Sequence, residues 1–330
     1  EEIASGRAML AVGTHALFQD DVTFNDLGLA VIDEQHRFGV HQRMSLQAKG
    51  KGVDVLVMTA TPIPRTLVLT SYGDMDASRL TEKPAGRKPV DTRTMSMDRT
   101  DQVIDGVARA MDQGSKAFWV CPLVEEDESG ELAAAEARYA ALKERFGARV
   151  GLVHGRMKSA DKDAVMAAFK DGEVDLLVAT TVIEVGVDVP AATVMVIEHA
   201  ERFGLAQLHQ LRGRIGRGTA KATCLLLYRG PLGGAARARL NTLRETEDGF
   251  RIAEEDLRLR GHGELLGTRQ SGFPEFRLAD LAVHGDLLAA ARDDVKLVLD
   301  RDPDLDGKRG RALRVLLYLF EQDTAVRYIR

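Results

Sequence analysis

Residues 27–36 read LGLAVIDEQH, a short aliphatic run that ends in two adjacent carboxylates. Branched apolar residues bounded by Gly and Asp are typical of a strand. Ligands of open α/β sheets bind at the carboxyl ends of such strands, which is where Asp33 and Glu34 would lie. There one carboxylate would hold Mg²⁺ through water and the next would orient an attacking water, as nucleotide hydrolysis requires. Acids are also common in the loops that follow strands, so the pair alone leaves a plain loop as the alternative.

Strand-like and helix-like stretches alternate around this run. Residues 8–12 and 53–59 are also strand-like, and residues 40–48 are compatible with a helix. Such alternation predicts parallel strands joined by crossover helices, and hence an α/β fold with doubly wound parallel sheets. Two prolines and a glycine interrupt the pattern in EKPAGRKPV, residues 82–90, which predicts a linker.

The alternation resumes beyond this linker and then gives way to helical spacing of leucine and alanine. We expect strands at 116–120, 150–153, 176–179, 193–197 and 222–228, with helices at 100–113, 130–146 and 159–170. We expect further helices at 237–247, 252–259, 278–299 and 310–321, with glycine-rich breaks at 261–267 and 271–272. The domain boundaries that follow are 1–82 for a first α/β domain, 83–94 for the linker, 95–230 for a second α/β domain and 231–330 for a helical region.

Two further stretches carry polar chemistry. Thr59-Ala60-Thr61 ends the strand at 53–59, and its hydroxyls suit hydrogen bonds to a neighbouring loop, although a turn is the alternative. Residues 210–217 read QLRGRIGR, and on a helix Arg214 and Arg217, three apart, would share a face and reach one phosphate chain. Guanidinium groups stabilise the charge that builds on a transferring phosphoryl group. A solvated basic surface is the alternative for this stretch.

The composition is that of a folded protein, with 45% hydrophobic and 29% charged residues. No apolar run approaches the ~18 residues of a membrane helix and no secretory signal is seen, so we expect a cytoplasmic protein. The net charge of −5 argues mildly against nucleic acid, but residues 202–217 hold four arginines and no acid. Cys121 and Cys224 lie in apolar runs without metal-ligand spacing and are expected to be reduced core thiols.

Taken in order, these stretches resemble the superfamily 2 helicases. DEQH, TAT and QLRGRIGR resemble motifs II, III and VI, while residues 13–16, 118–122 and 177–188 resemble motifs Ib, IV and V. DEQHRFGVHQR, TATPIPRTL, TSYGDMD and QLHQLRGRIGRG resemble the RecG family almost throughout. Residues 247–272 resemble the helical translocation hairpin that this family shares with the transcription-repair coupling factors. One departure is His262, where the family usually has proline.

The resemblance implies two RecA-like domains with ATP and Mg²⁺ bound between them. It assigns Mg²⁺ binding to Asp33 and water activation to Glu34. Other residues that the resemblance places at the nucleotide, as γ-phosphate sensors, arginine fingers or residues of the ATP cleft, are Gln35, His36, Gln210, Arg214, Arg217, Gly186 and Asp188.

The resemblance also implies residues that touch DNA or couple ATP to movement. The ones expected to contact DNA phosphates, or to relay the nucleotide state, are Thr14, His15, Thr59, Thr61, Thr180 and Thr181. Arg260 and Gln270 would lie in the loop of the hairpin and help to convert domain closure into DNA movement. Each has a plainer alternative, since Thr180 and Thr181 would also suit a strand end and Arg260 and Gln270 a helix end.

The function that the resemblance implies is an ATP-dependent DNA helicase and double-strand translocase that remodels replication forks and Holliday junctions in recombination and repair. Branched double-stranded DNA and a single-stranded-DNA-binding protein are the implied partners, and the parent is expected to be a monomer. Three alternatives stay open: a transcription-repair coupling translocase, an RNA helicase, and a non-catalytic DNA-binding module. Intact Asp33, Glu34, Arg214 and Arg217 argue against the last, since a decayed site has no chemical reason to keep all four.

A glycine-rich phosphate loop ending in GK[ST] is absent from these 330 residues, since Gly50-Lys51-Gly52 lacks both the spacing and the hydroxyl. The chain begins with Glu1 rather than Met, and motif II lies 33 residues from the start. We therefore expect a fragment of a longer protein, and we expect the isolated chain to be nearly inert toward ATP.

Overall fold

A computed structural model describes residues 1–19, 21–33, 49–50, 52–60, 77–82, 84, 86–122, 128–180, 189–264 and 284–319. The first part of the chain holds a two-stranded parallel sheet of β1 (Leu29–Ile32) and β2 (Asp54–Val57), preceded by the 3-10 helix η1 (His15–Phe18). Residues 8–12, expected to be a strand, are not one: Met9, Leu10 and Val12 are exposed and lie outside any sheet. The prediction was wrong because apolar residues form a strand only where a neighbouring strand pairs with them.

The second part is a six-stranded parallel sheet in the order β3-β8-β7-β4-β6-β5. Its strands are β3 (Val90–Ser96), β4 (Lys116–Val120), β5 (Val150–Val153), β6 (Leu176–Ala179), β7 (Ala192–Ile197) and β8 (Ala222–Tyr228). The helices between them are α3 (Thr100–Asp112), α4 (Glu128–Phe146), α5 (Ser159–Asp171) and α6 (Leu205–Arg212), with 3-10 turns η3 (Met97–Arg99), η4 (Gly147–Arg149) and η6 (Ala200–Arg202). The expected doubly wound parallel architecture is confirmed.

Both faces of this sheet are apolar. In β4, Phe118 and Val120 point into one core, where they meet Phe169 of α5 and Leu208 of α6. Trp119, the residue between them, points into a second core lined by α3 and α4. Because successive strand residues face opposite sides, a strand covered on both sides must be apolar throughout. The expected strands at 116–120 and 176–179 are therefore confirmed. Their residues are apolar except Lys116, whose buried ammonium donates to the carbonyls of Phe169 and Lys170.

β3 was not predicted. It begins at Val90, inside the range 83–94 that we expected as the linker, and pairs along its whole length with β8. Its sequence VDTRTMS alternates buried Val90 and Thr92 with exposed Asp91 and Arg93. Because most of these residues are polar, the sequence does not show the apolar run that is typical of a buried strand.

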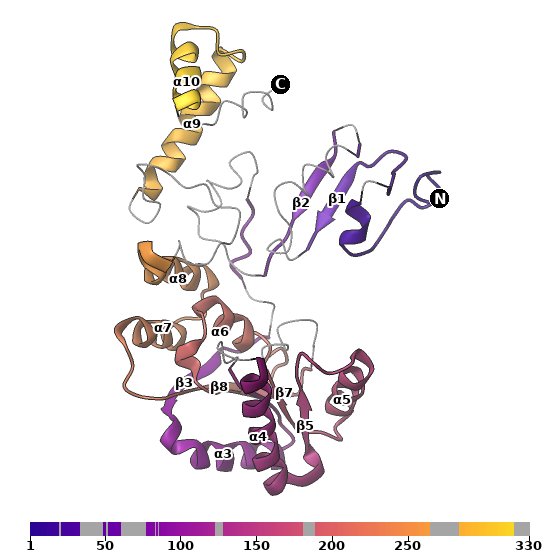
Figure 1. Ribbon diagram of the computed structural model, residues 1–330, viewed down its shortest axis with the longest axis vertical. Coiled ribbons are helices and arrows are strands. Elements are labelled where there is room, and N and C mark those ends of the chain that lie inside the picture. The colour runs from indigo at the N-terminus through magenta and orange to yellow at the C-terminus, as the bar shows by residue number, and fades with distance from the viewer. Residues whose placement is uncertain are drawn as a thin grey trace.

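In the part of the chain that the structure describes, four helices follow β8: α7 (Gly234–Glu245), α8 (Gly249–Glu264), α9 (Gly285–Arg301) and α10 (Lys308–Leu319). α7 and α8 pack with α6, next to the six-stranded sheet, and α9 and α10 lie side by side at the opposite end of the view (Figure 1). α8 runs through Gly261 and Gly263, so the expected break at 261–267 does not begin where we placed it. The backbone at His262 is helical.

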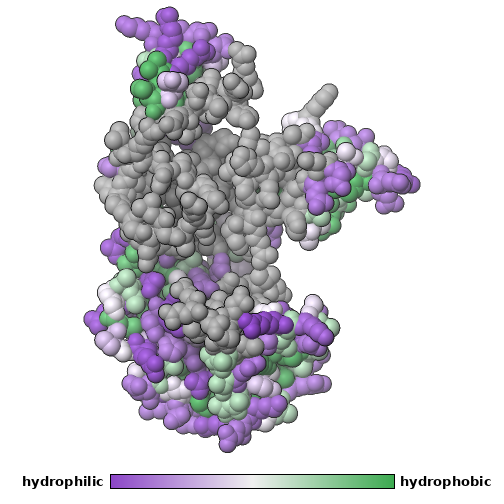
Figure 2. Space-filling view, in the orientation of Figure 1, coloured by the Kyte–Doolittle hydropathy of each residue, from purple (hydrophilic) through white to green (hydrophobic). Residues whose placement is uncertain are grey.

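Apolar side chains reach the surface mainly away from the six-stranded sheet. They lie on α9 and α10 and on β1 and β2, where Figure 2 shows green patches. The residues concerned are Leu287, Val295, Leu297, Val315, Leu316, Leu319, Leu29, Val31, Leu56 and Met58. Among the described helices, none is both long enough and apolar enough to cross a membrane.

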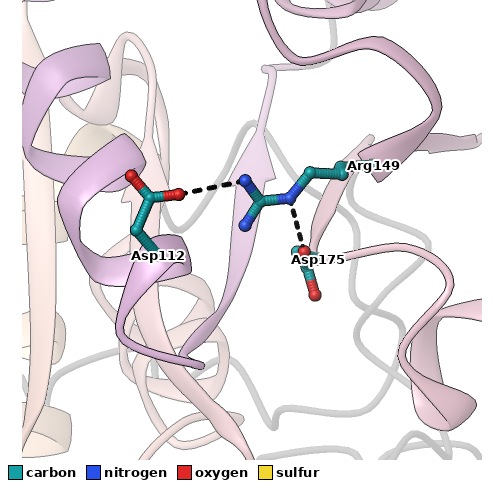
Figure 3. A network of polar contacts seen from close by, with 3 residues as sticks. All are labelled: Asp112, Arg149 and Asp175. Atoms are coloured by element: carbon teal, nitrogen blue, oxygen red, sulfur yellow. Dashed lines mark hydrogen bonds and ion pairs between the residues drawn. The ribbon is translucent and has the colours of Figure 1, made fainter.

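The amino edge of the six-stranded sheet is tied by one arginine. Arg149, just before β5, donates from Nε to Asp175 Oδ2 at 2.7 Å and from Nη1 to Asp112 Oδ1 at 3.1 Å (Figure 3). Asp175 precedes β6 and Asp112 is the last residue of α3. These ion pairs are partly exposed, so their combined contribution is on the order of 1 kcal/mol. They brace the edge opposite to the one where ligands of such sheets bind.

Both cysteines are free and buried, as expected. Burial raises the pKa of the Cys224 thiol to about 12 and raises that of Cys121 further. At pH 8 we predict that both thiols of the native protein react with Ellman's reagent at least about a thousandfold more slowly than an exposed thiol of pKa ~8.5, because so little thiolate forms. Unfolding in guanidinium should release two rapidly reacting thiols. Rapid reaction of either thiol in the native protein would contradict the burial.

Candidate functional site

Asp33 and Thr59 lie at the same edge of the first sheet. Ile32, the last residue of β1, is paired with Val57, the last residue of β2, and the Met58 N–H donates to the Ile32 carbonyl at 2.8 Å. Asp33 follows Ile32 directly, and its side chain is exposed. Asp33, expected at the nucleotide, and Thr59, expected to relay the nucleotide state, therefore lie at one carboxyl edge, where ligands of open sheets bind. Glu34, Gln35, His36 and Thr61 lie outside the described residues.

The arginine-rich stretch is arranged differently from our expectation. α6 holds Gln210 but ends at Arg212, so Arg214 and Arg217 do not lie on a helix and do not share a helical face. They follow the helix in a turn in which the Arg214 N–H donates to the Leu211 carbonyl at 3.0 Å. Arg217 is exposed and Arg214 is partly buried. The turn, rather than the helical repeat, sets the spacing of the two guanidinium groups.

Gly216 makes this turn possible. Its φ is +66°, a left-handed conformation that residues with a Cβ rarely adopt. A Cβ at this position would also lie 3.0 Å from the Ala222 Cβ and 3.3 Å from Val90 Cγ2. The Gly216 N–H donates to the Ala192 carbonyl at 3.3 Å, which fixes the turn against the start of β7. The backbone just before Arg217 is therefore fixed to the sheet.

The carboxyl edge of the six-stranded sheet gathers a second set of polar residues. Thr180 follows β6, His154 follows β5, and Glu198 follows β7. Thr180 is only 4% exposed, and its N–H donates to the Val153 carbonyl at 3.3 Å. Of the remaining expected residues on this side, Thr181, Gly186 and Asp188 lie outside the described residues.

Glu198 is a buried carboxylate that the sequence analysis did not single out. It is 7% exposed and accepts a hydrogen bond from Trp119 Nε1 at 2.7 Å. Arg138 of α4 forms an ion pair with it, Nε lying 2.5 Å from Oε1, without the alignment of a hydrogen bond. The Arg138 guanidinium also lies 5.5 Å from the centre of the Trp119 ring. The cluster fixes α4 to the ends of β4 and β7.

Arg212 is the second residue that the sequence analysis missed. It is 3% exposed and donates to the carbonyls of Leu243 at 2.5 Å and Thr246 at 3.0 Å. Burial lowers the pKa of its guanidinium, and the neighbouring Cys224 and Glu247 act in the opposite direction. An arginine inside an arginine-rich stretch gives no sequence signal that distinguishes it from its less buried neighbours Arg214 and Arg217.

The residues expected to touch DNA or to couple movement are only partly described. Thr14 is exposed and precedes η1, whose first residue is His15; its side chain does not cap that helix. The backbone of Arg260 belongs to α8. Gln270 lies outside the described residues.

Within the described ranges, no group of three or more His, Cys, Asp or Glu side chains could hold a metal ion. The aspartates of the turn between α9 and α10 are used internally. Asp302 accepts hydrogen bonds from the N–H groups of Asp306 and Gly307, both at 2.9 Å, and Asp306 pairs with Arg314 at 3.3 Å. This acidic turn is therefore held by its own backbone and by arginine.

We predict that Glu198→Ala lowers the free energy of unfolding by about 2–4 kcal/mol, because it leaves Arg138 and the Trp119 N–H without their shared partner in the interior. Urea denaturation measures this change. Asp91→Ala is the control: it breaks the exposed pair with Arg93 and should cost less than about 1 kcal/mol. Equal effects of the two substitutions would contradict the buried cluster.

Comparison with known families gives two matches. Residues 97–219 match the helicase conserved C-terminal domain, and residues 246–316 match the C-terminal part of domain 3 of the ATP-dependent DNA helicase RecG. The first match covers the six-stranded sheet from η3 to just before β8 and includes α6 with the arginine turn. The second covers α8, α9 and most of α10.

Individual relatives agree with these matches. The chain is 54% identical over 305 residues to the ATP-dependent DNA helicase RecG of Acidithiobacillus ferridurans, covering 92% of this chain and 45% of the relative. It is 57% identical over 287 residues to that of Escherichia coli (strain K12), covering 85% and 41%. A solved structure of RecG bound to a three-way DNA junction matches with a TM-score of 0.66 and 47% identity, over 87% of this chain and 37% of that one. The chain thus spans less than half the length of these relatives, and it belongs to the RecG family of ATP-dependent DNA helicases.

Proposed function

We propose that this chain is the motor portion of an ATP-dependent DNA helicase and double-strand translocase that remodels replication forks and Holliday junctions. The observation that carries this proposal is the 47% identity, over 87% of the chain, to a RecG that is bound to a three-way DNA junction. The family match at residues 246–316 is specific to RecG and favours it over a transcription-repair coupling translocase. An RNA helicase would leave that match unexplained.

At the nucleotide, we assign Mg²⁺ binding to Asp33 and activation of water to Glu34, with Gln35 and His36 as γ-phosphate sensors. Mg²⁺ usually keeps several waters and takes one or two carboxylates together with phosphate oxygens. An exposed carboxylate at the end of a parallel strand fits that donor set. Thr59, at the same edge, is suitably placed to relay the state of the site. Bound ATP would supply the phosphoryl group whose transfer these residues promote.

Arg214 and Arg217, with Gln210 beside them, are assigned to the phosphates from the second domain. Their place in a turn held by Gly216 supports this role, because a fixed backbone reduces the entropy lost when guanidinium groups meet a phosphate. Gly186 and Asp188 are assigned to the same cleft. We propose that the two RecA-like domains close on bound ATP. The first is 1–82, and the second, expected at 95–230, is extended here to begin with β3 at Val90.

On the DNA side, we assign phosphate contacts to Thr14, His15 and Thr181, and coupling to Arg260 and Gln270. Contacts to the phosphate backbone carry no sequence information, which suits a motor that must run along any duplex. The exposure of Thr14 supports its assignment. For Thr180, the burial of the side chain fits the alternative role of ending a strand better.

The proposal extends to the surroundings of the motor. Branched double-stranded DNA is the substrate that the junction-bound relative favours. We further propose a cytoplasmic, monomeric parent that works with a single-stranded-DNA-binding protein.

We predict that Arg217→Ala, in the complete polypeptide that carries these residues, lowers the ATP turnover number by at least about a thousandfold, as expected for loss of an arginine finger. ATP affinity, measured by equilibrium binding, should change far less, because the charge that Arg217 meets develops in the transition state. Arg93→Ala is the matched control, since Arg93 is exposed on β3 and pairs with Asp91. Turnover of Arg217→Ala within tenfold of the parent would contradict the role.

We also predict that forked DNA stimulates ATP turnover of the complete polypeptide more than linear duplex of the same length does. The comparison should be made at one fixed salt concentration, since the phosphate contribution to binding falls steeply with salt. Equal stimulation by the two substrates would remove the support for fork remodelling and leave a general duplex translocase.

A further inference from the structure

Hydrogen bonds from Arg212 stabilise the turn between α7 and α8, residues 246–248. This arginine is the last residue of α6, and the carbonyls of Leu243 and Thr246 accept its hydrogen bonds. The final carbonyls of a helix lack helical partners and form the negative end of its dipole. A guanidinium group, with several donors in one plane, can satisfy several of them at once. Arg212 thus closes the end of α7 with a buried positive charge.

The same turn also forms a hydrogen bond with β3. Glu247 Oε1 accepts a hydrogen bond from the Val90 N–H at 2.5 Å, and Val90 is the first residue of β3. Arg212 Nη1 also lies 3.4 Å from Thr92 Oγ1 on that strand. β3 is where the chain enters the second sheet from the preceding segment. The end of α6, the start of β3 and the α7–α8 turn therefore converge on one set of buried and partly buried hydrogen bonds. We call it the Arg212 joint (Thr92, Arg212, Leu243, Thr246 and Glu247, with the Val90 N–H).

α8 starts directly from this joint. Asp248 Oδ1 accepts hydrogen bonds from the N–H groups of Phe250 at 2.9 Å and Arg251 at 3.4 Å, which caps the helix. Ile252 of the first turn is 1% exposed and packs in the same core as Leu208 and Leu211 of α6. The capped first turn is thus fixed both by hydrogen bonds and by apolar contact with α6.

Two residues that precede β3 reach the same region. The Arg79 guanidinium lies 5.0 Å from the centre of the Phe250 ring, in the first turn of α8. Arg87 Nη2 donates to the Gly213 carbonyl, immediately after Arg212, at 3.3 Å. The segment that leads into β3 therefore touches both α8 and the end of α6.

We propose that Arg212 is a positioning residue that fixes the start of α8 to the end of α6 and to the start of β3, so that α8 moves as one body with the arginine turn. This inference rests on the proposed translocase function and adds a residue to it. Arg212 acts through the α7–α8 turn rather than by touching nucleotide or DNA. Loss of the joint should leave Arg214 and Arg217 able to promote hydrolysis while α8 follows them less faithfully.

The test compares Arg212→Met with the parent in the complete polypeptide. Methionine keeps much of the buried volume but donates no hydrogen bond. We expect ATP turnover on forked DNA to stay within about threefold, while the number of base pairs remodelled per ATP falls about tenfold, within the range found for residues that carry coupling. In Arg212→Lys the number of base pairs remodelled per ATP should lie between those of Arg212→Met and the parent, since an ammonium group can donate to some of the same carbonyls. Arg244→Met, which removes an exposed arginine from the last turn of α7, should leave the ratio unchanged.

A second variant keeps the inference testable if Arg212→Met does not fold. Glu247→Ala removes the contact to β3 and should lower the same ratio. Hydrogen exchange gives a reading that is independent of remodelling: in both variants the amides of residues 250–256 should exchange faster, while those of β4 stay protected. Equal losses of turnover and remodelling, or an unchanged ratio with unchanged exchange, would overturn the inference. A parent that remodels no fork would instead overturn the proposed function, and exchange would still test the joint.

Discussion

Burial of the central strands on both faces is the constraint on which the rest of this structure depends. β4, β6 and β7 carry apolar side chains toward both cores, and water must be excluded from each side by helices. Helices on both faces require crossover connections, crossover connections make neighbouring strands parallel, and parallel strands deliver their carboxyl ends to one edge. Glu198, Thr180 and His154 stand together for that reason. The placement of chemistry at one edge is thus a consequence of how the core is covered.

The strands that this constraint governs were the ones the sequence predicted best. Runs such as AFWV, residues 117–120, have no polar face and can only be buried, and the structure places both ends of the strand 116–120 where they were expected. β3 escaped because it has a neighbour on one side only among the described strands, and its outward positions tolerate Asp91 and Arg93. For residues 8–12 the error was the reverse: a strand was expected from apolar residues, but apolar residues without a pairing partner do not form one.

In the candidate site, too, the positions that depend on local strand ends were predicted and those that depend on distant contacts were not. The position of Asp33 and Thr59 followed from strand ends, which depend on local sequence, and the parallel pairing of β1 and β2 brings them to one edge. The helical spacing of Arg214 and Arg217 was wrong because Gly213 and Gly216, both visible in the sequence, end the helix and reverse the backbone. Arg212 and Glu198 depend on partners that are 31 to 120 residues away in the chain. Sequence-local patterns carry no information about such partners.

The position of β3 at the edge of the second sheet limits where the chain can be divided. The helicase family match starts at residue 97, one residue after this strand ends. A polypeptide begun there would keep every described helix of the sheet but would remove one of the two neighbours of β8, along Ala222–Tyr228, and leave only β7 beside it. Every second residue of β8 would then present unpaired N–H and C=O groups along that edge of an apolar strand, the geometry that promotes edge-to-edge aggregation. β3 therefore serves as the protective border of the second sheet as well as its entry point.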